Sequence, residues 1–298
     1  MKFTIKPDST LSQTKIKIQN VPTLIVKRSE DASTLSENSC DHTGHISFSK
    51  DTFSSKQNIG LLWIHGGGYM LGMKEMVYMG RAANLVRKFG ITVLSPGYTL
   101  SWLKPYPAAI NDCYKVLEYM HTQMHFDSIM IGGESAGGGL CAALCMMARD
   151  NGIPISFQFP LYPMLSNFDT ESSRDNHGKV WNTKKNHLGW KLYLRKNAKK
   201  EVSPYASPSR QNDYHNLPPC YTFVGDGEPF YCETLEYVKN LQAAGVCAKV
   251  DVYHTNMHAF DMMKSQVPIS KKAIQNFEEN FGKALFEKKM NTPDADSQ

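Results

Sequence analysis

The stretch IMIGGESAGGGLCAALCMMARD (Ile129–Asp150) places one serine among glycines, between two apolar segments. The apolar residues before the serine are typical of a buried strand, and those after it are typical of a buried helix. Glycine inside regular structure costs about 0.5–1 kcal/mol relative to alanine. Glycines crowded around Ser135 therefore indicate close backbone approach or unusual dihedral angles at this point.

The five residues Gly133–Gly137 fit the pattern G-x-S-x-G. In a strand–turn–helix context this pattern predicts a nucleophile elbow, a sharp and strained turn that exposes the serine hydroxyl. The alternative is a glycine-rich turn that binds phosphate or only connects two elements. A Walker A loop is excluded because no Gly-Lys-Ser/Thr follows, and G-x-G-x-x-G is also absent here.

Apolar runs bounded by Gly or Pro alternate with longer amphipathic segments along most of the chain. The expected strands are Ile59–His65, Ile91–Tyr98, Ser128–Glu134, Ile155–Pro163, Cys220–Asp226 and Ala248–His254. The expected helices are Glu75–Phe89, Ala108–Met124, Ala136–Asp150, Tyr231–Ala244 and Ser270–Lys288. Near-continuous apolar strands separated by helices predict an α/β fold with a largely parallel sheet.

The chain is expected to form a single domain over residues 1–298. Residues 31–56 are rich in Ser, Thr and Asp and are interpreted as a loop with one short strand, HISFS. The segment 165–209 contains a helix without a following strand and is interpreted as an excursion over one end of the sheet. Small cap elements are accordingly expected from residues 1–45 and 165–200.

A second glycine cluster, His65-Gly66-Gly67-Gly68, follows the strand that begins at Ile59. Acyl transfer passes through a tetrahedral oxyanion, which needs two or three N–H donors directed at it; loss of one costs about 2.7–4 kcal/mol. Three glycines after a strand allow peptide planes to turn their N–H groups towards the elbow. A plain glycine-rich turn is the alternative.

A serine hydroxyl needs a histidine base that is oriented by a carboxylate. Of the ten histidines, His258 lies in the loop after the last expected strand, where a base is expected in this kind of fold. Three carboxylates follow the preceding strand and are candidates for the acid: Asp226, Glu228 and Glu233.

Composition excludes several other classes of protein. The 298 residues carry a net charge of +5, and the basic residues are scattered apart from the run 191–200. A single local run of this kind is interpreted as a solvated helix face and not as a nucleic-acid site. No segment has the length of a membrane helix, and the N-terminus lacks the apolar core of a secretory signal. Seven cysteines without a C-x-x-C pair, with Cys141 and Cys145 expected as buried thiols, favour a cytoplasmic setting.

Taken together, these motifs resemble the hormone-sensitive-lipase-like branch of the α/β-hydrolase esterases, from about Ile59 to Asp261. The resemblance rests on HGGGY, PGYTLSWLKPYPAAINDCY, GGESAGGGL, SPYASP, LPPCYTFVGDGEPF and MHAFD, in the family's order and spacing. It implies Ser135 as nucleophile, His258 as base, and an oxyanion hole formed by the N–H groups of Gly67, Gly68 and Ala136. It also implies a supporting role for Glu134 and a structural role for Asp112.

The chain departs from the family pattern at several positions. The family's usual acid is the Asp of an Asp-Pro pair, and Glu228 occupies that position before Pro229, so Glu228 is favoured over Asp226. Thr99 stands where the family usually has Arg, and Trp102 where it has Pro. The first sixty residues match little of the family.

The expected function is that of a serine carboxylesterase acting on short-chain acyl or acetyl esters through a Ser-Glu-His triad and an acyl-enzyme. No metal and no organic cofactor is implied. The expected partner is a small-molecule ester, without nucleic acid or membrane, and a homodimer is left open. The alternatives are a catalytically silent relative that binds a small ligand, and an amide or peptide hydrolase with the same triad.

Overall fold

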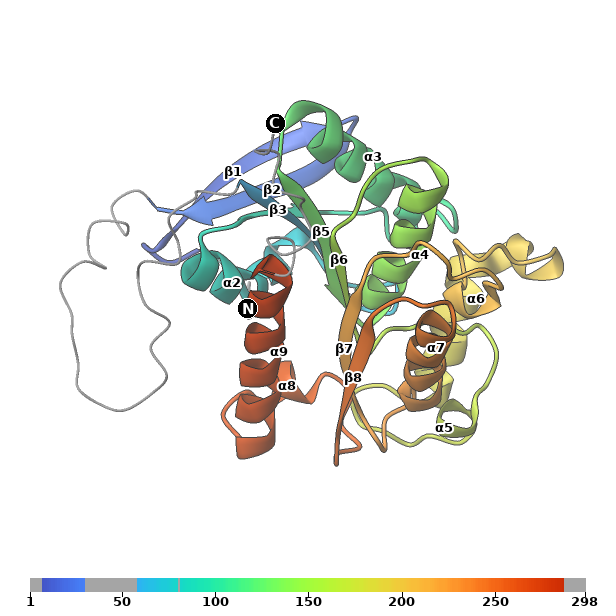
Figure 1. Ribbon diagram of the computed structural model, residues 1–298. Coiled ribbons are helices and arrows are strands. Elements are labelled where there is room, and N and C mark those ends of the chain that lie inside the picture. The colour runs from blue at the N-terminus through green and yellow to red at the C-terminus, as the bar shows by residue number, and fades with distance from the viewer. Residues whose placement is uncertain (1–6, 30–57, 80, 287–298) are drawn as a thin grey trace.

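The computed structural model describes residues 7–29, 58–79 and 81–286. Within them an eight-stranded sheet has the order β1-β2-β4-β3-β5-β6-β7-β8 (Figure 1). From β4 to β8 all neighbouring strands are parallel, whereas β1 and β2 pair antiparallel with each other and β2 pairs antiparallel with β4. The strands are β1 (Leu11–Ile18), β2 (Val21–Arg28), β3 (Ile59–Ile64), β4 (Thr92–Pro96), β5 (Ser128–Glu134), β6 (Phe157–Leu161), β7 (Cys220–Gly225) and β8 (Ala248–Tyr253).

Helices cover both faces of the sheet. On one face lie α2 (Arg81–Phe89) and α9 (Pro268–Phe286), and on the other lie α3 (Ala108–Gln123), α4 (Ala136–Asp150) and α7 (Tyr231–Ala243) (Figure 1). Each face has its own apolar core. The strands in the middle of the sheet are buried on both sides, as their continuous apolar sequences predict.

The six strands and the alternation of strands and helices expected from the sequence are confirmed. The helix expected over Glu75–Phe89 is divided into a 3₁₀ turn, Lys74–Met79, and α2. The hairpin of β1 and β2 was not predicted. Five of the eight β1 residues are exposed, since β1 pairs with one neighbour only, so its sequence lacks the apolar run of a central strand.

This hairpin changes the interpretation of the N-terminal segment. Residues 7–29 of the expected cap piece 1–45 extend the sheet, and they do not cover its end. The other residues of that piece, and the expected strand HISFS, lie outside the described residues.

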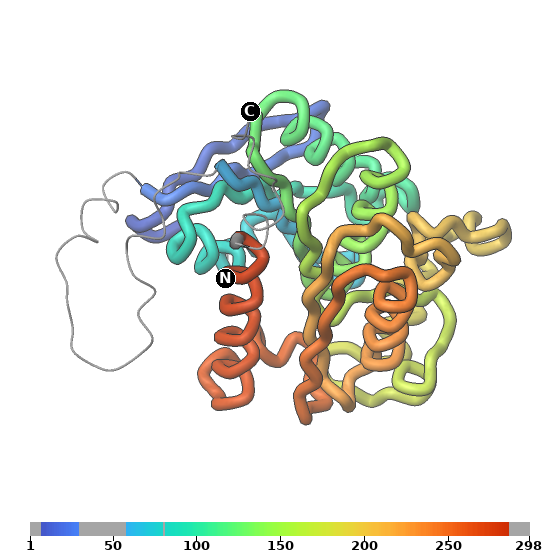
Figure 2. The backbone as a smooth tube through the Cα atoms, viewed as in Figure 1, coloured from blue at the N-terminus to red at the C-terminus, as the bar shows by residue number. Residues whose placement is uncertain are grey.

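The segment between β6 and β7, residues 162–219, leaves the sheet and includes the excursion expected over 165–209. Figure 2 shows it in yellow-green and yellow, looping beside α4 and α7 before it returns to β7. It contains α5 (Glu171–Arg174), α6 (Thr183–Leu194) and two 3₁₀ turns, Arg195–Lys199 and Pro208–Arg210. It lies beyond the carboxyl ends of the parallel strands, where open α/β sheets bind their ligands.

Candidate active site

Ser135 occupies the junction between β5 and α4. Its backbone lies at φ 57° and ψ −120°, a region that costs a non-glycine residue about 1–3 kcal/mol. The turn is closed by contacts that leave no room for side chains, since a Cβ on Gly137 would lie 2.1 Å from the carbonyl oxygen of Ile64. The expected elbow is therefore present, and it presents the serine hydroxyl at the N-terminus of a helix.

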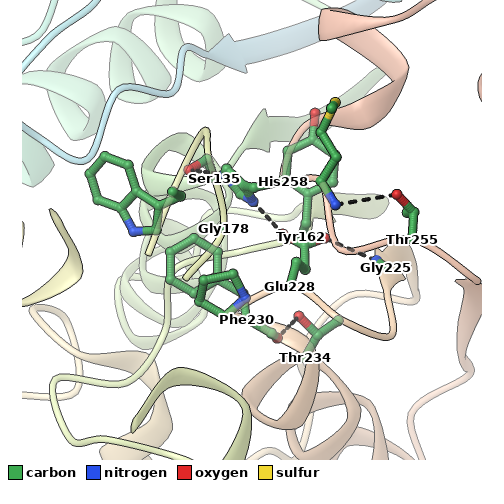
Figure 3. Close-up of polar contacts among 12 residues, drawn as sticks. Ser135, Tyr162, Gly178, Gly225, Glu228, Phe230, Thr234, Thr255 and His258 are labelled. Carbon is green, nitrogen blue, oxygen red and sulfur yellow. Dashed lines mark hydrogen bonds and ion pairs between the residues drawn. The ribbon is translucent and has the colours of Figure 1, made fainter. Parts of the chain in front are cut away.

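His258 lies in the loop between β8 and α8 (Phe260–Met263), 123 residues from Ser135 along the chain. Its Nε2 is 2.8 Å from Ser135 Oγ, and its Nδ1 contacts a carboxylate oxygen of Glu228 (Figure 3). With Nδ1–H donating to Glu228, Nε2 is free to accept the serine proton. The three side chains are buried, with 6%, 4% and 0% exposure for Ser135, His258 and Glu228.

Glu228 is fixed by the turn that follows β7. Its Oε1 accepts a hydrogen bond of 2.9 Å from the N–H of Gly225, which leaves Oε2 to face His258. One carboxylate therefore joins the end of β7 to the imidazole. The extra methylene of Glu, relative to the Asp of the family pattern, is accommodated within this turn.

The two other candidate carboxylates contact different groups. Asp226 accepts from His254 Nδ1 at 2.7 Å and from the N–H of Thr255 at 3.1 Å, and the hydrogen bond from His254 lowers the pKa of Asp226. Glu233 accepts from the N–H groups of Leu165 and Ser166 at 2.6 and 3.2 Å. Of the three, the structure brings only Glu228 to His258.

Aromatic side chains enclose the imidazole of His258. The rings of Tyr162 and Phe230 each lie 5.0 Å from it, both nearly perpendicular to its plane (Figure 3). The indole of Trp181 lies 6.5 Å away on the cap side. This enclosure keeps the ring in one orientation and excludes water from it.

The expected oxyanion donors lie at two loop ends next to the elbow. Gly67 and Gly68 have positive φ values of 116° and 61°, which turn their peptide planes after β3. Within the described residues, the N–H groups of Gly67, Gly68 and Ala136 donate to no protein acceptor. Three unpaired N–H groups next to one serine are suited to binding a negatively charged oxygen.

The segment between β6 and β7 packs directly on this glycine loop. A Cβ on Gly68 would lie 2.0 Å from Trp181 Cη2, so the indole is in van der Waals contact with the loop. The next residue, Tyr69, stacks on Tyr193 of α6 with ring centroids 3.9 Å apart. The conformation of the glycine loop therefore depends on the segment between β6 and β7.

The two further positions implied by the resemblance are also accounted for. Glu134 is buried beside Ser135, and burial raises its pKa to about 7 while the Arg81 guanidinium opposes that shift. Asp112 accepts from the N–H and the hydroxyl of Thr99 at 3.0 and 2.6 Å, so Thr99 is joined to α3 without the family's usual Arg.

Arg81 was not predicted, although a charge on the apolar face of an amphipathic helix is a signal that could have identified it.

Within the described ranges, no cluster of three or more His, Cys, Asp or Glu side chains is arranged to hold a metal ion. None of the helices that the structure describes combines the length and the apolar character needed to cross a bilayer.

Comparison with known proteins identifies the family. The family described as α/β hydrolase fold matches residues 61–262, more than half of the chain. The chain therefore belongs to this family, and the expected resemblance to its hormone-sensitive-lipase-like branch is confirmed.

Relatives and solved structures agree with this assignment. The chain is 29% identical over 213 residues to the carboxylic ester hydrolase LipN of Mycobacterium tuberculosis, covering 67% of this chain and 56% of LipN. It is 27% identical over 248 residues to an acetyl esterase of Salmonella dublin, covering 78% of this chain and 73% of that protein. A solved bacterial heroin esterase superposes with a TM-score of 0.78 at 26% identity, covering 93% of this chain and 85% of that chain.

The buried carboxyl of Glu233 generates a prediction about stability. Burial raises its pKa to about 8, well above the usual 4.5, so the folded protein binds an extra proton between about pH 4.5 and 8. The free energy of unfolding attributable to this group therefore falls as the pH rises through that range, by on the order of a few kcal/mol. We expect Glu233→Gln to gain stability relative to the unmodified protein on going from pH 5 to pH 9, measured by urea unfolding.

The matched control for this experiment is Glu201→Gln, which changes an exposed carboxyl. Its stability difference from the unmodified protein should be the same at both pH values. An unchanged difference for Glu233→Gln as well would mean that Glu233 is ionised in the folded protein.

Proposed function

We propose that this protein is a serine carboxylesterase that hydrolyses short-chain acyl or acetyl esters. The observation that carries the proposal is the hydrogen-bonded series Ser135–His258–Glu228, which lies beside three unpaired backbone N–H groups. The names of LipN and of the Salmonella acetyl esterase support the same reaction class.

The first half of the reaction forms an acyl-enzyme. His258 Nε2 takes the proton of Ser135 as Oγ attacks the ester carbonyl carbon, and Glu228 stabilises the imidazolium that results. The carbonyl oxygen becomes an oxyanion that accepts hydrogen bonds from Gly67, Gly68 and Ala136. The imidazolium then protonates the alcohol oxygen as the C–O bond breaks and the alcohol leaves.

The second half repeats these steps with water. His258 deprotonates a water molecule, which attacks the acyl carbon through a second oxyanion. Collapse of that intermediate breaks the bond to Ser135 Oγ, and Oγ regains its proton from His258. The products are a carboxylic acid and an alcohol, and no cofactor is needed.

The preference for short acyl chains, of roughly two to six carbons, rests on the cap. Trp181 is 8% exposed and contacts both Gly68 and the region of His258, so its indole limits the space beside the reacting carbonyl. Its Nε1–H reaches Asn186 Oδ1 at 3.4 Å, which ties the indole to α6.

Replacement of the nucleophile tests the reaction class. Ser135→Ala should abolish hydrolysis of p-nitrophenyl butyrate and labelling by a fluorophosphonate, with cooperative unfolding retained because no core cavity is opened. Turnover above about a tenth of the unmodified value would contradict the assignment. An unmodified protein that stays unlabelled would indicate a silent ligand-binding relative, and faster hydrolysis of an anilide than of the matched ester would indicate an amidase.

The identity of the acid is tested by two neutral replacements. Glu228→Gln should lower kcat by two to four orders of magnitude, in line with the ~10⁴ loss when a triad acid is neutralised. Asp226→Asn removes a carboxylate from the same turn and should change kcat by less than tenfold, since Asp226 contacts His254 and Thr255. The reverse ranking would assign the acid to Asp226.

Trp181 is the expected determinant of chain length. Trp181→Ala should raise the ratio of kcat/KM for octanoate to that for acetate by about tenfold or more, because extra methylenes gain room. Trp102→Ala, which removes a 55% exposed indole, serves as the control and should leave the ratio unchanged. Faster hydrolysis of dodecanoate than of butyrate by the unmodified protein, with activation at an emulsion interface, would overturn the short-chain preference.

A further inference from the structure

Arg81 is a buried cation behind the candidate active site. It is the first residue of α2, and its side chain is only 4% exposed. Its Nη2 donates to the Tyr162 hydroxyl at 2.6 Å and forms an ion pair with Asp261, and its Nη1 lies 3.9 Å from Glu134 Oε2. Glu134 ends β5, Tyr162 follows β6 and Asp261 lies in α8. One guanidinium therefore links segments that are far apart in the sequence.

Two of these partners lead to the base. Asp261 lies three residues after His258, at the start of α8. Tyr162 presents its ring to His258 at 5.0 Å, and its hydroxyl lies 3.2 Å from Asp261 Oδ1. The Arg81 guanidinium also stacks over the Tyr162 ring at 5.4 Å. Arg81 thus holds both the aromatic wall beside His258 and the helix that follows it.

The third partner leads to the nucleophile and the glycine loop. Glu134 immediately precedes Ser135, and a Cβ on Gly66 would lie 2.9 Å from the Glu134 carbonyl oxygen and 3.4 Å from Glu134 Cγ, so Gly66 packs directly on Glu134. Gly66 is the residue before Gly67, the first of the proposed oxyanion donors. Any shift of the Glu134 carboxyl is therefore passed to the elbow and to the start of this loop.

One buried cation faces two buried carboxyl groups in this cluster. Arg81, Glu134 and Asp261 are at most 6% exposed, and among the described residues Arg81 is the cation that forms ion pairs with the two carboxyls. Burial raises the pKa of Glu134 to about 7, and the Arg81 charge keeps the pKa from rising further. Without Arg81, Asp261 would be left as a buried and unpaired carboxylate, which is strongly destabilising.

We propose that Arg81 is a positioning residue for ester hydrolysis, which holds the nucleophile elbow, the glycine loop and the His258 loop in mutual register through Glu134, Tyr162 and Asp261. This inference rests on the proposed function. It does not make Arg81 a catalytic residue, since the guanidinium touches neither Ser135 nor the space where an ester would react.

The competing interpretation is a buried ion pair that contributes to stability alone. Arg81→Met removes one partner of a buried ion pair, which is destabilising whether or not the residue positions the site, so activity and stability must be measured separately. A lysine keeps the charge but lacks the planar fork that reaches several acceptors at once. The comparison of Lys and Met at this position therefore separates charge from geometry.

The experiment compares Arg81→Met, Arg81→Lys and the control Arg87→Met in the full chain. Arg87 lies on the same helix, where it binds Asp8, Thr10 and Asn84 at the surface. We expect Arg81→Met to lower kcat for p-nitrophenyl butyrate on the order of 10²-fold with KM changed less than threefold, as for a misplacement of about 1 Å in a catalytic site. Arg81→Lys should lose about tenfold, and Arg87→Met should stay within twofold.

The split between stability and turnover per active site is a readout that a purely structural role would not move. Loss of folded protein lowers the number of active sites and leaves kcat per labelled site unchanged. Misplacement of the elbow relative to His258 lowers kcat per labelled site, so kcat is referred to the concentration of sites that a fluorophosphonate labels.

One result would overturn the inference: kcat per labelled site within threefold of the unmodified protein in folded Arg81→Met. If Arg81→Met does not fold, Arg81→Lys decides, and its retention of full kcat would refute a role for the fork geometry. Fluorophosphonate labelling separates this inference from the proposed function. The Arg81 variants should label slowly but completely, whereas an unmodified protein that does not label refutes the esterase itself.

Discussion

The backbone of Ser135 lies in a conformation that its own residue type disfavours, and the rest of the site is arranged around it. The strain is held by packing: β5 is paired on both sides by parallel strands, α4 begins at the next residue, and Gly137 permits the contact with β3. Because strand and helix are both buried, the turn between them has no room to relax. The hydroxyl therefore projects beyond the carboxyl end of the sheet.

His258 and Glu228 are held by the neighbouring end of the same sheet. β7 and β8 are adjacent and parallel, so the turns that follow them lie side by side. The turn after β7 carries Glu228, and the loop after β8 carries His258. The contact of Asp226 with His254 and Thr255 joins these two loops at their exposed side, so Asp226 helps to hold Glu228 near His258 without contacting the imidazole of His258 itself.

Residues outside the sheet form the remaining wall of the candidate active site. The segment between β6 and β7 places Trp181 against Gly68, and Tyr193 against Tyr69. The segment between β6 and β7 is thus packed on the glycine loop. It limits the space above Ser135, and it also holds the loop N–H groups in their directions. On the opposite side, Arg81 and its buried partners give the elbow and the His258 loop a second support.

The sequence by itself determined the features that are local. Gly133–Gly137, the glycines after His65 and the six apolar runs each depend on neighbours in the chain, so periodicity and residue type were enough to predict the elbow, the glycine loop and the α/β fold. Motif register also favoured Glu228 before any geometry was available. The prediction of the fold succeeded because burial restricts which residues a short segment can contain.

The tertiary structure decided which distant residues meet. Three carboxylates lie within eight positions of one another, and only their contacts distinguish them. Glu228 contacts His258, Asp226 joins two loops through His254, and Glu233 is buried against the backbone of Leu165. The contacts of Trp181 with Gly68, and of Arg81 with Glu134 and Asp261, join segments that no local pattern relates. The hairpin of β1 and β2 was likewise invisible, because an edge strand that faces solvent does not need a continuous apolar sequence.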